Sequence, residues 1–515
     1  MNNANSFMNN MINTNSVIKL TICLSATIYV IVGIGLNYFS YLNPGDGVFY
    51  ISLADSLVDN GKLQDIATIP PHHHITYQNG IVYVIALLKV IFHSYWIIPY
   101  TVIISFLWSI AYYKCYILIF RLFNSHVLAA LFLCVNFLQV ETLVYSNSFY
   151  NESVYNPLLL LFMTHFLGIS LFQREGAFRI KTIIAHQNQI LQIIILILFL
   201  TLGIFFRNQH LTLLLSIMAY TLVFERKLFA KMAIVLVITG IFFYAYFFSI
   251  GKAISLDFIV NHIYSSLSGI STCSFIFIIN QFIYYLYPQR LFGQCSNISV
   301  GFGIIGLIIV FYGMLQMRRR MGEIFYLVVI YIITTFLFIL IITPPYFADN
   351  RYSGEGIQFL ILLFTFGGLE GISSKFPKIS IRILGLALTT FVICFFFMAY
   401  LHFYRINNND SKKTFNKYSV VQTFKEMHQP RNFLIYATDY RLVYWYLKEP
   451  VCTVEPDQCA KLKGASIESP IVYIGDRNEF NESNYEWAGE YQIGSSLGIA
   501  VGTWGVYPIY KNSKK

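Results

Sequence analysis

Two adjoining stretches near the N-terminus decide the fold: residues 17–39, VIKLTICLSATIYVIVGIGLNYF, and residues 41–63, YLNPGDGVFYISLADSLVDNGKL. The first exceeds the roughly 20 apolar residues that a helix needs to cross a bilayer, so we expect an uncleaved first transmembrane helix. The second places a lone carboxylate, Asp46, between two glycines at the head of an amphipathic segment. The question is whether Asp46 caps a helix or takes part in chemistry.

The composition of the whole chain supports a membrane protein. Of its 515 residues, 56% are hydrophobic and 12% are charged, and the mean hydropathy is +0.59. Soluble domains carry about 25% charged residues, so a single core could not absorb this much apolar surface. The net charge of +10 does not indicate nucleic acid, because Lys and Arg gather in the cytoplasmic loops of membrane proteins. We therefore expect a multi-pass membrane protein.

Eleven apolar segments are candidate spans. They lie near residues 17–39, 97–120, 127–146, 154–172, 189–206, 208–224, 231–250, 300–317, 323–343, 357–372 and 380–401. A further segment, GIVYVIALLKVIF at 80–92, would reach about 20 Å as a helix, which is short of a core about 30 Å thick. We expect it to lie flat at the interface rather than to cross.

The distribution of basic residues sets the orientation. Five clusters recur along the chain: Lys114 with Arg121; Arg174 with Arg179 and Lys181; Arg226, Lys227 and Lys231; Arg318, Arg319 and Arg320; and Lys375, Lys378 and Arg382. If 80–92 lies flat, all five fall on the side of the N-terminus, as the positive-inside rule requires. The expected topology has a cytoplasmic N-terminus and an outward C-terminus, in a membrane that we take to be the bacterial cytoplasmic (inner) membrane.

This topology gives an all-α multi-pass domain over 1–401 and an extracytoplasmic soluble domain over 402–515. The first outward loop, 40–96, would carry the interfacial helices, and a second large loop covers 251–299. Within the tail, RNFLIYAT and SPIVYIGD read as buried strands and DYRLVYWYL as a helix between them. We expect a small α/β domain.

Cysteine spacing predicts one disulfide in the tail. Cys452 and Cys459 lie close together on the outward side, where thiols oxidise. Cys273 and Cys295 share an outward loop and are a weaker candidate pair. No Cys/His spacing resembles a zinc site.

The segment after Asp46 has the pattern of a surface helix. Over residues 49–59 the apolar side chains share one face and the polar side chains the other, and Gly61 follows as a stop. A carboxylate at the start of such a helix satisfies free N–H groups and favours the helix dipole. Capping does not explain the long polar loop that follows, because a loop of this length is usually functional.

Several motifs together resemble a known family. The first motif resembles the first outward loop of GT-C-type glycosyltransferases, which take sugars from polyprenyl-phosphate carriers. It consists of Asp46, an aromatic residue, SLADSL, Gly and then TYQNGIVYVIALL. Protein O-mannosyltransferases and lipid A aminoarabinose transferases are relatives of this kind. SNSFYNESVYNPLLLL, LGIFFRNQHLTLLL and DNRYSGEGIQFLILLF resemble, in chain order, the second outward loop, a helical hairpin with a basic turn and a late Arg-Tyr motif.

The resemblance implies roles for individual residues. Asp46 would be the catalytic base, with Glu152 as a helper or metal ligand, in an inverting displacement. Arg207, Arg351 and Tyr352 would bind the donor phosphate. His210 and His74 are weaker candidates, for carrier contact and for metal binding. A divalent metal would depend on Asp46 and Glu152, and the sequence leaves it open.

The implied partners are a polyprenyl-phosphate sugar and a lipid, glycan or protein acceptor, with no nucleic acid. Many O-mannosyltransferase-like members have Asp-Glu where this chain has Asp46-Gly47, which leaves a second acidic role unassigned. Plainer readings stay open: Arg207 as an interfacial turn residue, Arg351 as an ion-pair partner of Asp349, and Glu152 as a solvated loop residue.

Three other functions compete with glycosyl transfer. An envelope polysaccharide polymerase or ligase uses similar carriers, but usually lacks the acidic first loop and the soluble tail. A transporter or lipid flippase would place its ionisable residues near mid-membrane rather than at the outer rim. A non-catalytic envelope scaffold is the third alternative.

Overall fold

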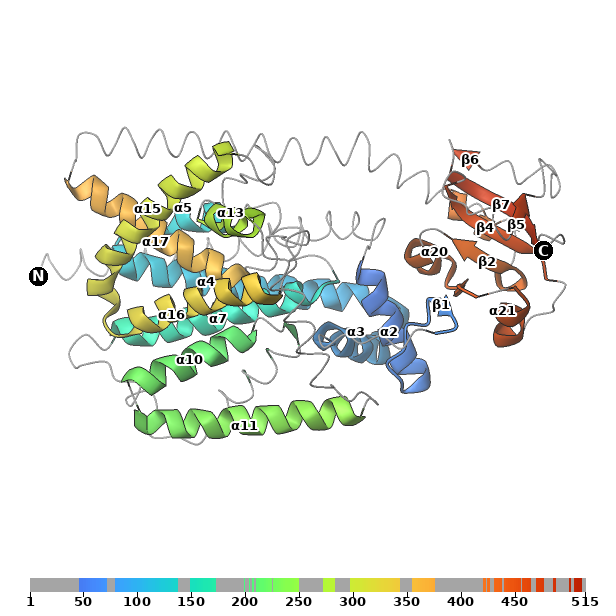
Figure 1. The fold of residues 1–515 in the computed structure, drawn as a ribbon, viewed down its shortest axis with the longest axis horizontal. Coiled ribbons are helices and arrows are strands. Elements are labelled where there is room, and N and C mark those ends of the chain that lie inside the picture. The colour runs from blue at the N-terminus through green and yellow to red at the C-terminus, as the bar shows by residue number, and fades with distance from the viewer. Residues whose placement is uncertain are drawn as a thin grey trace, which may run out of the picture. The chain divides into compact units, whose positions relative to one another are not determined.

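A computed structural model gives the fold (Figure 1). It describes residues 46–71, 79–137, 149–172, 199, 203, 206–207, 210–224, 226–249, 272–282, 297–342, 354–375, 420–422, 424–426, 430–437, 440–454, 456–464, 469–476, 485–487, 500–501 and 504–511. The chain divides into two compact units. We call them the helical unit (residues 1–32, 102–146 and 151–398) and the mixed unit (residues 33–101, 147–150 and 399–515).

The helical unit is built from long apolar helices. Its described helices are α4 (Ile97–Phe123, which begins in the mixed unit), α5 (His126–Phe137), α7 (Asn151–Phe172), α10 (His210–Phe224), α11 (Arg226–Ser249), α13 (Thr272–Gln281), α15 (Asn297–Met321), α16 (Ile324–Ile342) and α17 (Gly354–Lys375). All but α13 coincide with an expected span. The expected spans at 17–39 and 380–401, and most of the one at 189–206, lie outside the described residues.

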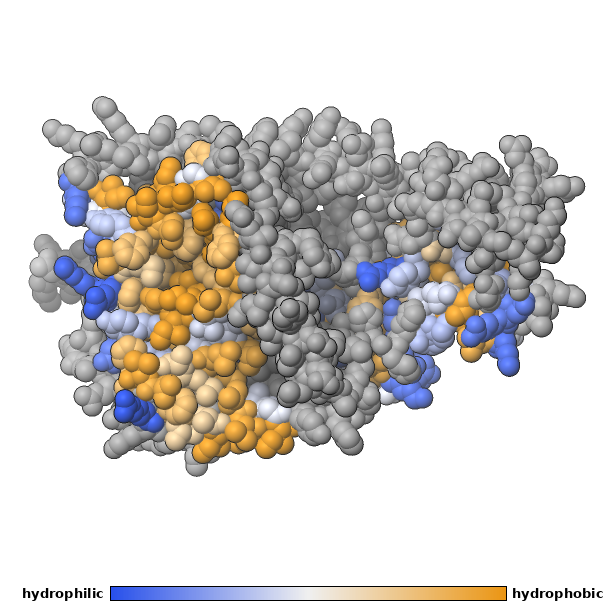
Figure 2. All heavy atoms as spheres, in the orientation of Figure 1, coloured by the Kyte–Doolittle hydropathy of each residue, from blue (hydrophilic) through white to orange (hydrophobic). Residues whose placement is uncertain are grey.

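Two of the described helices are long and apolar enough to cross a membrane, over Ile97–Phe123 and Val300–Met321. Large apolar side chains are also exposed on α11 and α15, for example Ile241, Ile308 and Phe311, each more than 60% accessible. Figure 2 shows such apolar side chains gathered over the helices of this unit. Helix faces of this kind suit lipid better than water. The number of crossings stays a prediction.

Helices α15 and α17 form the closest helix pair, through a seam of glycines. A Cβ added at Gly313 would overlap the backbone carbonyl oxygen of Phe364, and one added at Gly368 would overlap that of Ile309. At Gly367 the nearest atom would be Met317 Cγ, at 2.7 Å. Small residues that let two backbones touch are typical of helix packing inside membranes.

The basic C-terminal end of α15 meets the ends of two other helices. Arg320 pairs with Glu370 of α17 at 2.8 Å and donates to the carbonyl of Leu122, at the end of α4, at 3.0 Å. Its guanidinium also lies 5.5 Å from the centre of the Phe123 ring. The C-terminal ends of α4, α15 and α17 therefore lie together, as the charge pattern predicts; the side of the membrane they face stays a prediction.

The mixed unit combines two helices of the first loop with a small sheet. The helices are α2 (Asp46–Asn60) and α3 (Gly80–Phe92), followed by the 3₁₀ turn η1 (His93–Tyr95). Helix α3 has the expected bounds, whereas α2 begins at Asp46 itself rather than after it. Gly61 ends α2 with φ +66° and donates to Leu57 at 3.1 Å. The tail adds η6 (Pro430–Asn432), β2 (Leu434–Ala437), α20 (Tyr440–Leu447), β3 (Val451–Cys452), α21 (Pro456–Lys463), β4 (Ile471–Asp476), β5 (Tyr485–Trp487), β6 (Ala500–Val501) and β7 (Trp504–Lys511).

The tail is α/β, as predicted. Its sheet has the order β2-β4-β7-β5, with β6 also paired to β7. The β2–β4 pair is parallel, in the register Leu434 to Ile471, and α20 lies between these strands in the chain. The pairs that β7 makes with β4, β5 and β6 are antiparallel.

The described part of loop 40–96 packs with the tail. Strand β1 (Thr68–Ile69) of the loop pairs in parallel with β3 of the tail, Thr68 opposite Val451. Helix α2 packs against α20. The ring of Phe149 lies 5.4 Å from Trp96 and 6.4 Å from Trp445, between centroids. The compact units therefore do not follow the expected boundary at residue 402, because loop 40–96 groups with the tail.

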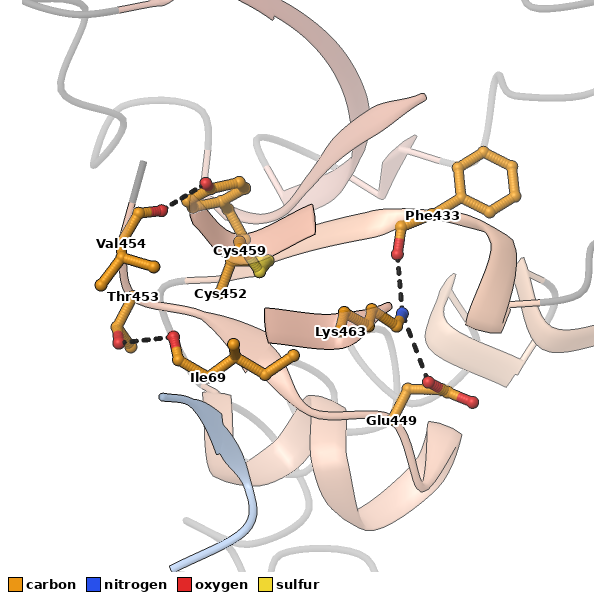
Figure 3. The surroundings of a disulfide bond; sticks show 9 residues. Ile69, Phe433, Glu449, Cys452, Thr453, Val454, Cys459 and Lys463 are labelled. Atoms are coloured by element: carbon orange, nitrogen blue, oxygen red, sulfur yellow. Dashed lines mark hydrogen bonds and ion pairs between the residues drawn. A yellow bond between two sulfur atoms is a disulfide. The ribbon is translucent and has the colours of Figure 1, made fainter. Parts of the chain in front are cut away.

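The disulfide expected in the tail is present, between Cys452 of β3 and Cys459 of α21 (Figure 3). Both cysteines are buried, in a small core with Ile69 and Leu434. Cys115 is buried and free, whereas Cys273 and Cys295 are not described in a disulfide: Cys273 lies in α13 and residue 295 lies outside the described ranges. The bond ties a strand to the helix that follows it.

The glycine seam predicts position-dependent effects of alanine. Gly313→Ala should lower the free energy of unfolding by about 1–3 kcal/mol, because the new methyl group meets backbone that cannot rotate away. Unfolding of the purified protein in detergent, followed by circular dichroism, measures this. Gly301→Ala in the same helix is the matched control, since nothing lies within 4 Å of its added Cβ. Equal stability of the two variants would contradict the seam.

Candidate functional site

A buried ion pair joins the start of α7 to the turn before α10. Glu152, the second residue of α7, pairs with Arg207, and both side chains are less than 10% exposed. The Arg207 N–H donates to Gly203 at 2.9 Å, and the His210 N–H donates to the Arg207 carbonyl at 3.0 Å. A tight turn thus presents Arg207 to Glu152. The alternative that Glu152 is a solvated loop residue is wrong, because its side chain is enclosed.

His210, the first residue of α10, extends this polar group. It is fully buried, and its Nδ1 lies 3.3 Å from the Tyr155 hydroxyl. Its ring meets the edge of Phe199 and covers Gly203, where an added Cβ would overlap the imidazole. Among the described residues the Nε2 atom has no hydrogen-bond partner. Tyr155 and Glu152 are three residues apart, so they share one face of α7.

Further hydroxyl groups continue along the interface of α10 and α16. Thr212 and Thr335 lie 3.1 Å apart between their Oγ1 atoms, and Tyr331 hydrogen-bonds with both. Ser216 donates to the Thr212 carbonyl at 2.5 Å. Buried polar groups therefore continue from Glu152 through His210 to the α10–α16 interface. Buried polar and ionisable groups of this kind mark functional sites by default in membrane helices.

Asp46 is the first residue of α2, in the mixed unit. The next residue, Gly47, is buried against Phe149, where an added Cβ would lie 3.1 Å from Phe149 Cβ. This close approach gives one physical reason for glycine after Asp46. The side chain of Asp46 lies outside the described part, so capping and catalysis both stay predictions.

A charged cluster holds α2 in the mixed unit. Asp55 pairs with Lys89 of α3 and accepts from the Tyr444 hydroxyl of α20 at 3.4 Å. One turn earlier, Ser52 donates to Asp65 at 2.5 Å, and Asp65 also accepts from the Ala67 N–H at 3.1 Å. Helix α2 is thus tied to α3, to the loop that follows it and to the tail.

Burial is the main cause of the pKa shifts of Lys89 and Tyr444 in this cluster. It lowers the pKa of Lys89 below its usual 10.5, although the Asp55 carboxylate opposes the change. It also raises the pKa of Tyr444 well above its usual 10, and Asp55 adds to the rise. The ring of Trp96 lies 5.1 Å from Lys89 Nζ and partly compensates the buried ammonium.

The structure tests the sequence-predicted site residues unevenly. It brings together Glu152, Arg207 and His210, whereas His74, Arg351 and Tyr352 lie outside the described residues. Helix α17 begins just after Arg351 and Tyr352, and its Gly356 packs against Leu159 and Met163 of α7, within 3.0 Å of an added Cβ. Within the described part of the chain, no group of three or more His, Cys, Asp or Glu side chains could hold a metal.

Sequence reasoning missed Tyr155, Lys89 and Tyr444. Lys89 had a visible signal, because it is the single charge in the apolar segment 80–92. Tyr155 follows Glu152 at the helical spacing of three. Tyr444 gave no such signal, since its partner Asp55 is 389 residues away in the chain.

Fold and site define a largely helical chain with helices able to cross a membrane, a buried ion pair and a separate α/β unit. No protein-family model matches the chain, and no curated protein matches it.

The buried pair predicts a distinctive pattern of stability. Arg207→Met should cost about 3–5 kcal/mol, because it leaves Glu152 buried without a partner. The double variant Arg207→Met with Glu152→Leu should regain most of that loss, since no buried charge remains. Unfolding in detergent measures all three proteins. Arg319→Met, at an exposed position, should change little; a double variant no more stable than the single one would contradict the pairing.

The pKa of Tyr444 predicts a loss of stability in alkali. Above pH 10 the unfolded chain releases the Tyr444 proton and the folded unit keeps it, so the folded state loses about 1.4 kcal/mol per pH unit. Below pH 10 this effect is absent. Tyr444→Phe should therefore lose less thermal stability between pH 9 and 11 than the wild type does. The control Tyr95→Phe, at a side chain 73% exposed, should follow the wild type.

Proposed function

We propose that the protein transfers a sugar from a polyprenyl-phosphate donor to an acceptor on the outer face of the bacterial cytoplasmic membrane. Asp46 acts as the base in an inverting displacement, and the reaction class is that of GT-C-type glycosyltransferases. The observation that carries the proposal is the buried Glu152–Arg207 pair with His210 beside it.

Arg207 has the chemistry that a departing phosphate requires. Its guanidinium is always charged and matches two phosphate oxygens at once. In the absence of donor, Glu152 neutralises it. A phosphate that takes over Arg207 would meet fixed positive charge in a site of low polarity, where such charge stabilises a developing anion most. Glu152 and His210 are then placed to exchange a proton or to hold the carrier.

Asp46 stands at the start of a helix that is firmly held. Its helix is anchored through Asp55, Lys89 and Tyr444, so the backbone of α2 has little freedom. A base is effective when its support fixes it close to the productive geometry. Arg351 and Tyr352 would complete the phosphate site, and the resemblance to the family motif is what supports their role.

The membrane placement rests on charge and on oxidation. The basic ends of α4, α15 and α17 lie together, which suits a common cytoplasmic side. The Cys452–Cys459 disulfide suits a tail in an oxidising compartment outside. Both observations support the topology in which α2 faces outward.

Substitution of Asp46 tests the proposal. Membranes carrying the protein are given polyprenyl-phosphate-linked radiolabelled sugar, and label transferred to envelope material is counted. Asp46→Asn should lower transfer about 100-fold or more, as expected for loss of a general base. Asp59→Asn, an exposed carboxylate near the end of the same helix, should transfer as the wild type does.

The same membranes separate the competing functions. Movement of the labelled lipid across the bilayer without transfer would favour a transporter or flippase. Transfer that is equal in the wild type and in Asp46→Asn would contradict the role of Asp46. Chain growth on a lipid-linked glycan, independent of Asp46, would favour the polymerase or ligase.

A further inference from the structure

A groove of about 780 Å³ lies in the mixed unit, and none of its lining residues belongs to α2. This volume is in the range of ligand pockets. It is lined by Ile66, Thr68, Ile69, Pro71, Arg431, Asn432, Glu449, Pro450, Leu462, Lys463, Gly464 and Ser469. One wall comes from the first outward loop and the others from the tail, so the groove exists because loop and tail fold together.

The floor of the groove is held by a charged side chain with fixed partners. Lys463 of α21 donates to the carbonyl of Phe433 at 2.8 Å and pairs with Glu449 at 3.3 Å (Figure 3). The Lys463 side chain is 10% exposed and that of Glu449 is 23% exposed. Because the Glu449 carboxylate balances its charge, Lys463 offers an oriented N–H donor to the groove and adds no net charge there.

Hydrogen bonds and a disulfide also hold the other segments that line the groove. The Thr453 N–H and hydroxyl both donate to the Ile69 carbonyl, each at 2.9 Å, which joins β3 to the loop. The Cys452–Cys459 bond fixes α21, the helix of Lys463, to the same strand. A groove that is already formed binds with a smaller entropic cost than one that must be ordered.

The lining chemistry indicates a hydroxyl-rich ligand. Arg431, Asn432 and Lys463 offer N–H donors, while Glu449 and the amide of Asn432 offer acceptors. A sugar hydroxyl donates and accepts at once, so it is served by such a mixed set. The exposed apolar side chains of Pro71 and Leu462 match the C–H faces of a pyranose ring. A polyanion fits less well, because Glu449 stands among the cations.

We infer that this groove binds an oligosaccharide, as the acceptor or growing product of the transferase. The acceptor role rests on the proposed function; the binding itself does not. Because Arg431 and Asn432 are exposed, they can be changed without disturbing a core.

Binding by the full-length protein in detergent tests the inference. The protein is applied to a printed array of neutral and acidic oligosaccharides and short peptides, and the best oligosaccharide is then titrated by calorimetry. Arg431→Ala and Asn432→Ala should each raise Kd about tenfold, through loss of hydrogen bonds. Lys461→Ala, an exposed lysine on α21 outside the groove, should leave Kd unchanged.

Three results would overturn the groove assignment: no oligosaccharide retained by the wild type, retention of peptides alone, or a Kd unchanged in both groove variants. Circular dichroism of each variant shows that the fold is intact. If the wild type binds an oligosaccharide but transfers no sugar, the groove assignment stands and the transferase proposal fails. If transfer occurs but nothing binds in the groove, the transferase proposal stands and the groove assignment fails.

Discussion

Charge buried among apolar helices has to find its partner inside the chain, and this constraint shapes the helical unit. Neither Glu152 nor Arg207 could remain enclosed alone, because an isolated charge away from water costs several kcal/mol. Their pairing fixes the start of α7 against the turn before α10, and His210 and Tyr155 are placed as a consequence. A pair of apolar residues would stabilise the same contact at least as well. A charged pair at this place is therefore compatible with the proposed phosphate site, and stability alone does not require it.

The same constraint acts at the basic end of the unit, with a different solution. Arg320 meets Glu370 and the free carbonyl at the end of α4, where about 30% of each side chain is exposed. A half-exposed ion pair loses less hydration than a buried one when it forms, and it contributes less to the free energy of unfolding. Close contact of α15 and α17 comes instead from glycine, which lets the backbones touch. Here stability comes from packing, whereas the Glu152–Arg207 pair is enclosed at the N-terminal end of α7.

In the mixed unit the organising contact is between chain segments nearly 400 residues apart. Strand β1 of the first loop pairs with β3 of the tail, and Asp55 of α2 reaches Tyr444 of α20. The loop that carries the proposed base therefore has the tail as its support. This arrangement also creates the groove, since neither segment alone provides all of its walls. The tail therefore forms one compact unit with the first loop rather than an appended domain.

The sequence by itself determined the elements whose signals are local. Apolar length and period predicted the helices, and Gly61 the end of α2. Short apolar runs predicted the strands β2 and β4, and two nearby cysteines in a tail expected to be oxidised predicted the Cys452–Cys459 bond. It also singled out Glu152, Arg207 and His210, because the motifs around them resemble those of GT-C-type glycosyltransferases. The burial of Glu152, its pairing with Arg207, the union of loop with tail and the groove were decided by tertiary structure alone. The physical reason is that hydrogen bonds and ion pairs across hundreds of residues leave no periodic trace in the chain.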